Sequence, residues 1–574
     1  MQTYSSGAVR LRIAGSAPPA LDVAPRPDPA KDEARVAAVL AALDGGNLDD
    51  AGKLAEQGLK SGSEHPVLLC VLAMALQTGG RLKDSLPYLR RAVALQPADA
   101  SIANALARCL LGLQRPEEAL QALDATLALE PRHAETHANR GQALERLGRL
   151  AEAEQSYLKA LELLPDQIVA RAGMASLCNH FGAYDDARTH AQTVLDAAPG
   201  YAPAALTLAM VELAQGAPAA AEKRIRRLLA EPSLDPLLDN YLGDALDAQD
   251  RVDEAFEAWS RSGEALRAVH AGRFADDDIL TAAEHAAEVF ESAGSLGGQA
   301  LAAAPDGMAR HAFLLGFARS GTSLLGLTLA GHGEVEILDE QEPLIDAMRE
   351  FGGPGGPDRL LRASEAELQH FRGAYWRRVK SAGALLRRPL LVDKQPMNSL
   401  NLPLIARLFP EARILLAQRD PRDVVLSCFR RRFLMNRYTY AMLSAEGAAR
   451  LYAAAMRLAQ RAGELAPLQI HRVSHEALVS GFETEVGAIC RFLGLPPCET
   501  MGAFAERVRS SAVATPSASQ LIRGLNSDGV GQWRRYARQL QPLAPILEPW
   551  VKRFGYESSL ADEAARRGSA RRAA

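Results

Sequence analysis

The sequence has few cysteines and no long hydrophobic run. Its six cysteines are scattered over 574 residues, and none forms a Cys-x-x-Cys pair. This spacing argues against a disulfide framework and against a zinc site, and it predicts a reducing, cytoplasmic location. No apolar run reaches the roughly 18 residues that a membrane-spanning helix needs, and residues 1–15 lack a signal-peptide core. We therefore expect a soluble protein with no membrane partner.

Neither sign of charge dominates the chain. Lysine and arginine number 65 against 69 aspartates and glutamates, for a formal net charge of −4. This balance gives no general attraction to nucleic acid. The chain is too long for one hydrophobic core, so we expect several domains. The proline-rich residues 1–32 and the end of the chain, residues 557–574, are predicted to be disordered tails.

A 34-residue period runs through residues 33–265. Prolines recur at this interval at Pro97, Pro131, Pro165 and Pro199, and small residues recur at Ala51, Ser85, Ala119, Ala153, Ala187, Ala221 and Ala255. Most of these small residues follow a glycine by five positions, at Gly46, Gly80, Gly148, Gly182 and Gly216. Glycine permits a turn at positive φ, small residues let two helices approach closely, and proline ends a helix. The period therefore predicts stacked helical hairpins that share one core.

The period resembles the tetratricopeptide repeat. The unit "AETHANRGQALERLGRLAEAEQSYLKALELLP" carries the family's small, aromatic and terminating residues at Gly141, Ala153, Tyr157, Ala160 and Pro165. The resemblance implies an all-α superhelical array with a concave groove that binds a protein or peptide. The alternative is an array that only supports or dimerises the rest of the chain, since a fold alone does not fix function. The oligomeric state is left open.

After residue 265 the pattern changes. A helical connector is expected over residues 266–307, followed by short apolar runs at 311–317, 389–394, 413–419 and 468–476, each leading into a helical segment. Strands that alternate with helices predict an α/β domain with a parallel sheet over residues 308–556. Ligands are expected at the carboxyl ends of its strands.

The stretch "GFARSGTS", residues 316–323, has the glycine spacing of a phosphate-binding P-loop. Thr322 stands where that loop has its lysine. The loop follows an expected strand and opens an expected helix, so it predicts a phosphate or sulfate site. Farther on, "AQRDPRDVVLSCF" places Arg419 at a strand end and Ser427 eight residues later, a pair able to hold a terminal phosphate. Alternatively, Arg419 pairs with Asp420 or Asp423.

Together, "GFARSGTS", "VDKQP" and "QRDPRDVVLSCF" resemble the sulfotransferases that use 3′-phosphoadenosine 5′-phosphosulfate (PAPS), and most of all the tyrosylprotein sulfotransferase-like branch. The resemblance covers residues 308–556. It implies a P-loop-like cradle for the 5′-phosphosulfate made of Arg319, Ser320, Gly321, Thr322 and Ser323. It also implies that Arg419 and Ser427 hold the 3′-phosphate. This donor has no γ-phosphate for a lysine to reach, which accounts for Thr322, and no metal is expected.

The resemblance also implies the catalytic groups. Glu340 lies 21 residues after Arg319, at the family's position for the base that takes the acceptor proton. Glu342 is a nearby rival, and a solvated acidic loop is the alternative. Lys394 in "VDKQP" would stabilise the leaving oxygen, a task shared with Arg319; otherwise it is a surface lysine that ends a strand.

Two nucleotide contacts are less specific. His475 follows the last expected strand, where the family often has tyrosine, so it is either a contact to adenine or a structural histidine. Arg523 in "LIRGLNSDGVGQWRRY" is expected to contact the donor from a closing segment. Ten residues later, Trp533 is expected in the core.

The sequence thus favours an enzyme that moves a sulfuryl group from PAPS to an acceptor hydroxyl, with a protein tyrosine among the candidates beside carbohydrate and small-molecule hydroxyls. One alternative is a non-enzymatic tetratricopeptide scaffold with an inactive transferase domain. The other is an ATP-dependent P-loop kinase, against which Thr322 counts.

Overall fold

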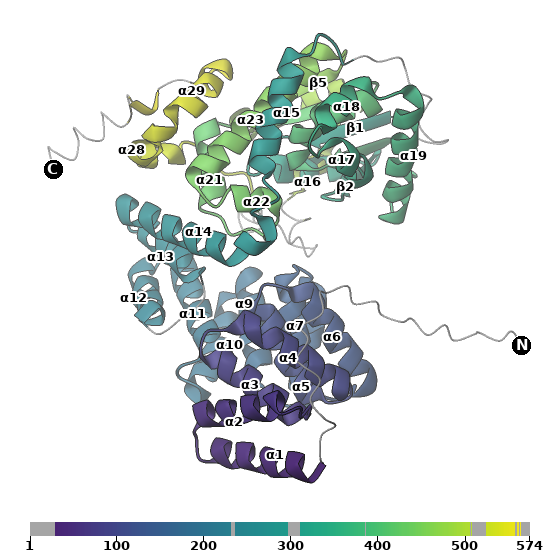
Figure 1. Cartoon of the computed structure of the whole chain (residues 1–574). Coiled ribbons are helices and arrows are strands. Elements are labelled where there is room, and N and C mark those ends of the chain that lie inside the picture. The colour runs from purple at the N-terminus through teal and green to yellow at the C-terminus, as the bar shows by residue number, and fades with distance from the viewer. Residues whose placement is uncertain are drawn as a thin grey trace, which may run out of the picture. The chain divides into compact units, whose positions relative to one another are not determined.

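The computed structural model describes residues 29–230, 236–296, 310–384, 386–504 and 524–556, together with residues 507, 559–561 and 563. The chain divides into two compact units, one that ends at Leu177 and one that starts at Cys178. Figure 1 shows the elements of both. Helix α1 begins at Pro29, and most of the two expected tails lies outside the described residues. No described helix is both long and apolar enough to span a membrane.

The N-terminal half is the predicted array of helical hairpins. Its helices are α1 (Pro29–Asp44), α2 (Leu48–Lys60), α3 (Pro66–Thr78), α4 (Leu82–Leu95), α5 (Ala100–Gly112), α6 (Pro116–Leu129), α7 (Ala134–Arg146), α8 (Leu150–Leu163), α9 (Ile168–His180), α10 (Tyr184–Ala197), α11 (Ala202–Ala214), α12 (Pro218–Ala230), α13 (Leu238–Asp247) and α14 (Val252–Phe274). Small residues do let these helices approach closely. The ring of Tyr157 lies so near Gly141 and Gly173 that a Cβ on either would overlap it.

The turn inside each hairpin has a left-handed residue at the same place in every repeat. The glycines at this place have φ between 73° and 80° and are Gly46, Gly80, Gly148, Gly182 and Gly216. In the two repeats that lack the glycine, Gln114 and Asp250 take the same conformation, with φ of 57° and 58°. The backbone therefore keeps the 34-residue period where the sequence breaks it.

Gln114→Gly is expected to stabilise the array. A left-handed residue with a Cβ costs roughly 1–2 kcal/mol, partly offset by the greater freedom of glycine in the unfolded chain. We expect a net gain of about 0.5–1 kcal/mol, measured as a higher urea midpoint of the helical signal. The reciprocal control, Gly148→Gln, should lower the midpoint by a similar amount. Unchanged midpoints in both variants would contradict a strained turn.

The C-terminal half contains the predicted parallel sheet, with one strand more than expected. Its strands are β1 (Arg310–Leu315), β2 (Val335–Asp339), β3 (Leu390–Lys394), β4 (Arg413–Gln418) and β5 (Gln469–Ser474). They pair in the order β2-β3-β1-β4-β5, and every pairing is parallel. The sequence analysis predicted all of these strands except β2.

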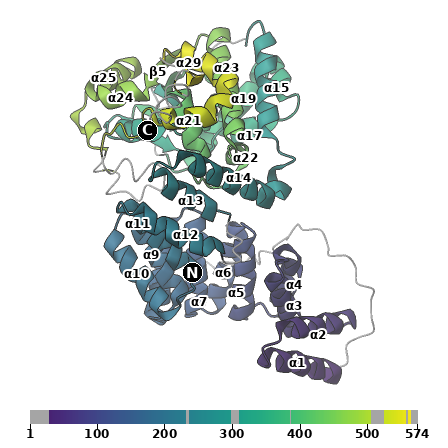
Figure 2. The same ribbon diagram turned by 90° about the vertical axis from the view of Figure 1, so that its left-hand side faces the viewer.

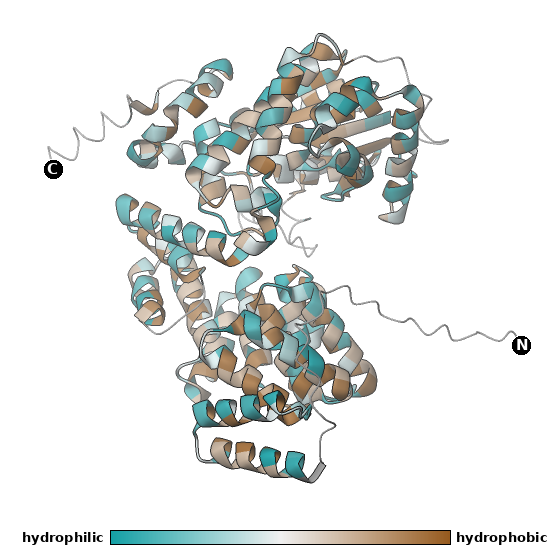
Figure 3. Cartoon of the chain, viewed as in Figure 1, coloured by the Kyte–Doolittle hydropathy of each residue, from teal (hydrophilic) through white to brown (hydrophobic). Residues whose placement is uncertain are grey.

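Both faces of the sheet are covered, as apolar parallel strands require. Phe313 and Leu315 of β1 belong to one hydrophobic cluster, whereas Ala312 and Leu314 of the same strand belong to another on the opposite face. The hydropathy colouring shows these strands as brown arrows between helices of mixed colour (Figure 3).

The other described helices of the C-terminal half lie before, between and after these strands in the chain. They are α15 (Ile279–Ser292), α16 (Thr322–Ala330), α17 (Ile345–Phe351), α18 (Gly356–Arg362), α19 (Glu365–Ser381), η1 (Pro396–Asn401), α20 (Leu402–Leu408), α21 (Pro421–Phe429), α22 (Arg437–Ala441), α23 (Ala445–Leu465), α24 (His475–Ser480), α25 (Phe482–Leu493), η2 (Glu499–Gly502), η3 (Gln532–Tyr536), α28 (Ala537–Leu540), η4 (Gln541–Leu543) and α29 (Ala544–Arg553).

The last hairpin of the array shares a hydrophobic core with the α/β part of the same unit. Trp259 of α14 lies with its ring centre 6.4 Å from that of Phe429 in α21 and 5.5 Å from that of Tyr536 in η3. Figure 2 shows α14 beside α22, which it also contacts. The last repeat therefore packs in the same hydrophobic core as α21.

Candidate active site

The carboxyl ends of the strands bring together the motifs that the sequence singled out. The loop 316–321 follows β1, Lys394 ends β3, Arg419 follows β4, and His475 follows β5. The chain leaves β1 for β2 on one side of the sheet and leaves β4 for β5 on the other. The strand order therefore reverses direction between β1 and β4, which is where open parallel sheets bind their ligands.

The loop after β1 is a compact turn closed by glycine. Arg319 and Gly321 have left-handed φ of 68° and 100°. The hydroxyl of Ser320 donates to the carbonyl oxygen of Phe317 over 2.7 Å and accepts from the same residue's N–H over 3.1 Å. A Cβ on Gly321 would lie 2.8 Å from Nδ1 of His475. The loop then opens α16, whose first N–H groups have no intrahelical acceptor and favour an anion.

Three arginines converge beside this loop. Arg419 donates to the carbonyl oxygen of Arg319 over 3.0 Å and to that of Gly529, while Nε of Arg319 donates to the hydroxyl of Ser427 over 3.0 Å. Burial, followed by the charges of Arg431 and Arg419, lowers the pKa of Arg319 to about 9. A buried cation whose pKa is lowered by neighbouring cations is typical of a site that receives an anion.

The carboxylates considered as partners of Arg419 are bonded elsewhere. Asp420 pairs with Arg422 over 2.7 Å. Asp423 accepts the N–H groups at both ends of the segment 531–533, over 2.6 and 2.8 Å. Arg419 donates to carbonyl oxygens instead. Among the described residues, no carboxylate is hydrogen-bonded to its positive charge.

Three buried polar atoms near the ends of β4 and β5 have no hydrogen-bond partner within the described part of the chain. They are Nε of Arg419, Nε2 of Gln418 and Nδ1 of His475. Burial, then the charges of Arg419 and Arg319, lowers the pKa of His475 to about 3, so its ring is neutral at neutral pH. An unmet buried donor costs free energy that a ligand recovers. These atoms therefore suit a polar ligand held by this edge.

Lys394 lies among carboxylates at the neighbouring strand ends. Its ammonium, 2% exposed, donates to Asp339 and to Glu340 over 2.6 Å each. The N–H of Glu340 also donates to the carbonyl oxygen of Lys394 over 2.8 Å, at a left-handed φ of 50°. The lysine is therefore no surface residue, and Glu340 is fixed beside it. Glu342 lies outside this cluster, on the wall of a cavity described below.

The segment 524–536 is anchored to the array as well as to the site. Asp247, the last residue of α13, accepts from Arg535 and from the hydroxyl of Tyr536 over 2.6 Å each, and from Arg430 at the end of α21 over 3.3 Å. One carboxylate from the last repeat thus holds both the end of α21 and the segment that contacts Arg419.

The other predicted residues have simpler outcomes. Thr322 and Ser323 form the first turn of α16, with Thr322 buried. Trp533 is fully buried, as expected. Arg523 lies outside the described residues. Within the described ranges, no group of three or more His, Cys, Asp or Glu side chains is placed to hold a metal ion.

Sequence reasoning missed the part that Asp339 plays. Because β2 was not predicted, nothing indicated that Asp339 ends a strand next to Lys394. The available signal was the short run "VEILD" followed by a second acid.

Comparisons with known proteins agree with this architecture. Residues 311–499 match the model of a sulfotransferase family. Residues 36–168 and 179–241 match models of the tetratricopeptide repeat.

Two curated relatives match a similar share of the chain. An uncharacterised protein of Aquifex aeolicus is 26% identical over 43% of this chain and 33% of its own length. Protein-tyrosine sulfotransferase 2 of Gallus gallus is 27% identical over 43% of this chain and 69% of its own length. The chain thus spans about a third of the first relative and about two thirds of the second.

Among solved structures, a tetratricopeptide repeat protein from Parabacteroides merdae is 22% identical, covering 40% of this chain and 92% of its own. Its TM-score is 0.33, too low to support any argument about this protein.

Proposed function

Because the chain carries tetratricopeptide repeats followed by a sulfotransferase-family domain, we propose that it transfers the sulfuryl group of PAPS to an acceptor hydroxyl. The observation that carries the proposal is the arginine cluster at the switch point. Burial and the charges of Arg431 and Arg419 lower the pKa of Arg319 there, and Nε of Arg419 has no hydrogen-bond partner within the described residues. A donor with a phosphate on the 3′-oxygen and a phosphosulfate on the 5′-oxygen of its ribose would accept hydrogen bonds from these arginines.

In this proposal the loop residues Arg319 to Ser323 hold the 5′-phosphosulfate, and Arg419 with Ser427 holds the 3′-phosphate. Ser427 contacts Arg319 in the structure, so both anion sites would share one hydrogen-bonded network. The neutral ring of His475 packs against the loop and would contact adenine.

Transfer requires one bond to form and one to break. The acceptor oxygen attacks sulfur in line, its proton passes to the carboxylate of Glu340, and the sulfur–oxygen bond to the 5′-phosphate breaks. The ammonium of Lys394, 2.6 Å from that carboxylate, would stabilise the bridging oxygen as it leaves. Glu342 is the alternative base.

For the partner of the repeats, we propose a protein or peptide bound along the array. We also propose cytoplasmic function and a protein tyrosine among the acceptors. The similarity to a protein-tyrosine sulfotransferase supports the tyrosine, and the tetratricopeptide matches support a protein partner. The expected domain bounds, 33–265 for the array and 308–556 for the transferase, are part of this proposal.

The direct test is transfer itself. The full chain is incubated with PAPS and a panel of tyrosine peptides, phenols and sugars, and mass spectrometry follows adenosine 3′,5′-bisphosphate and the sulfated product. The proposal predicts stoichiometric formation of both with at least one acceptor. Transfer from ATP with magnesium, and none from PAPS, would favour a kinase; no nucleotide binding of either kind would favour the scaffold.

Asp247→Asn is expected to weaken binding of adenosine 3′,5′-bisphosphate by about 3- to 10-fold. The variant loses the charged hydrogen bonds that hold Arg535 and Arg430, each worth roughly 1 kcal/mol or more, so the segment that contacts Arg419 closes less firmly. Isothermal titration calorimetry measures the change.

Asp239→Asn is the matched control. Asp239 pairs with Arg261 inside the array alone. Equal affinities for wild type and both variants would show that the last repeat does not position the closing segment.

A further inference from the structure

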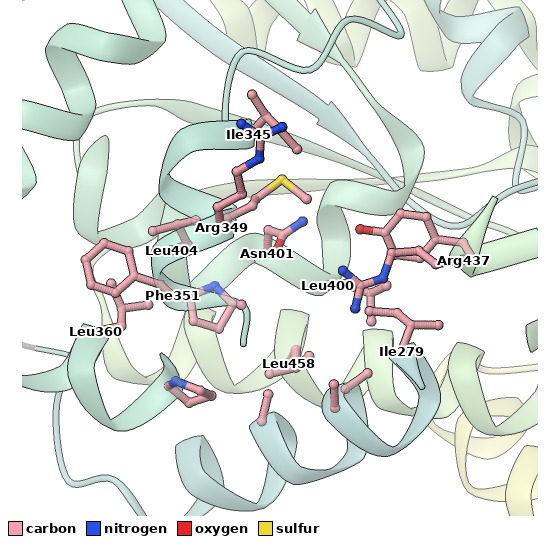
Figure 4. A pocket seen from close by; sticks show the side chains of 18 of the residues that line it. Ile279, Ile345, Arg349, Phe351, Leu360, Leu400, Asn401, Leu404, Arg437 and Leu458 are labelled. Carbon is pink, nitrogen blue, oxygen red and sulfur yellow. The ribbon is translucent and has the colours of Figure 1, made fainter. Parts of the chain in front are cut away.

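A cavity of about 360 Å³ lies in the second unit, apart from the arginine cluster. Figure 4 shows Ile279, Leu404 and Leu458 reaching it from three different helices. Its apolar wall comes from α15, α17, α18, α20 and α23, with the residues Ile279, Ala286, Ile345, Met348, Leu360 and Leu458 among them. The volume is within the range of small-molecule pockets.

Residues on the cavity wall are close in sequence to the proposed catalytic pair, Glu340 and Lys394. Glu342 on its wall follows Glu340 by two residues, and Leu400 and Asn401 on its wall belong to η1, which begins two residues after Lys394. The two segments that leave the proposed base and lysine therefore both reach the cavity.

The polar lining is balanced in charge. Arg437 pairs with Asp277 over 2.9 Å, and Arg349 and Glu342 supply one further charge of each sign. Two cations and two anions give the wall no net charge, which suits a neutral guest better than an acidic one.

Glu342 lines the cavity together with the polar residues Asn401 and Tyr438. Burial raises the pKa of Tyr438; the charge of Arg437 opposes the rise, the Glu342 carboxylate adds to it, and a hydrogen bond with Asn401 opposes it. Tyr438 and Asn401 are therefore hydrogen-bonded to each other, and together with Glu342 they place polar groups on the cavity wall that can bond a hydroxyl. Apolar walls with a few placed polar groups are the usual composition of a site for an organic ligand.

Part of the wall lies outside the match to the sulfotransferase family. Phe274, Ile279, Ala286 and Phe290 lie before residue 311, where the match to the sulfotransferase family begins. The connector helix α15 thus contributes a side of the cavity that the family domain alone would not have.

We propose that this cavity binds the apolar body of a neutral aromatic alcohol and presents its hydroxyl to the proposed base, which makes hydrophobic phenols the acceptor class. The inference rests on the proposed function for its chemistry, but not for the binding. A free phenol and a tyrosine side chain both carry a phenol ring. The two arms of the experiment distinguish between these two acceptors.

The test uses 2-naphthol as the probe, titrated by equilibrium dialysis without nucleotide into the full-length protein. Met348→Trp fills the cavity from α17 and Ala286→Phe fills it from α15; both residues are half-buried. His285→Phe adds the same ring to the exposed side of α15 and is the control. Wild type and control should bind alike, and both filled variants should bind at least 10-fold more weakly.

In the second arm, PAPS is added and the rates with 2-naphthol and with an acidic tyrosine peptide are compared. We expect 2-naphthyl sulfate to form with the higher kcat/KM, and filling the cavity to lower that value at least 10-fold. Unchanged naphthol binding in both filled variants would overturn the proposal. The proposal would also be overturned if the enzyme preferred the tyrosine peptide and if filling the cavity did not change the rate with that peptide.

Binding of adenosine 3′,5′-bisphosphate tests the donor site separately from the cavity. Its effect on the melting temperature should be the same in wild type and filled variants, which also shows that the variants are folded. If the bisphosphate had no effect on the wild type, the donor assignment would fail, whereas the naphthol titration would still decide the cavity.

Discussion

Glu340→Gln is expected to lower kcat by about 10²- to 10⁴-fold, the usual contribution of a general base. The amide is nearly the same size as the carboxylate but cannot accept the acceptor's proton. The glutamine oxygen still reaches Lys394, which keeps its bond to Asp339 as well, so the local structure should persist. Affinity for adenosine 3′,5′-bisphosphate should therefore change by less than threefold.

Glu342→Gln is the matched control for this substitution. It lies two residues away, outside the Lys394 cluster and on the cavity wall. It should raise KM for the acceptor more than it lowers kcat. The reverse pattern, with a normal kcat in the Glu340 variant and a large loss in the Glu342 variant, would move the role of base to Glu342.

Arg419→Ala is expected to weaken binding of adenosine 3′,5′-bisphosphate by about 30- to 150-fold and binding of adenosine 5′-phosphate by less than fivefold. Losing charge-assisted hydrogen bonds to a buried phosphate costs roughly 2–3 kcal/mol. The unpaired Nε of Arg419, beside the loop that carries Arg319, is the group that such a phosphate would engage.

A purely structural role for Arg419 gives a different result. Its bonds to the carbonyl oxygens of Arg319 and Gly529 join the loop to the closing segment. If those bonds were its whole contribution, the variant would weaken both nucleotides equally. Ser427→Ala is the smaller companion change and should follow the same selectivity with about 3- to 10-fold effects.

The array was predictable because the backbone geometry of its turns and helix ends requires particular residue types at a fixed interval. Positive φ recurs at one turn position, and five of its seven residues are glycine. Gln114 and Asp250 occupy the other two, so a glycine search alone finds an incomplete series. Packing of the neighbouring hairpins, which no single repeat determines, imposes the turn on them.

The sheet was predictable where its strands are continuous apolar runs, since strands buried on both faces read that way. The edge strand β2, "VEILD", is covered less completely and carries charged residues at both its second and last positions. Its pattern is too short and too polar to distinguish from a loop. Helices α17, α18 and α19 were not predicted either.

The positions of the predicted site residues near strand ends followed from the sequence, but their hydrogen-bond partners did not. Sequence spacing suggested that Ser427 and Arg419 hold one phosphate, which stays a prediction, and it gave no sign that Ser427 accepts from Arg319. The role of Asp247 could not be read from sequence at all, because it depends on contacts between residues about 290 positions apart. The cavity likewise depends on α15 packing against α18, α22 and α23, which no local pattern encodes.

Thermal unfolding of the full-length protein with adenosine 3′,5′-bisphosphate and no added metal, beside ATP with magnesium, tests the central claim most directly. A ligand at 100 times its Kd stabilises the native state by about 2.7 kcal/mol, enough for a rise of a few degrees in the transition of the unit that binds it. We predict a rise with the bisphosphate, which Arg419→Ala removes, and none with ATP and magnesium. A rise with ATP and magnesium alone, or with neither nucleotide, would contradict the assignment of a PAPS site.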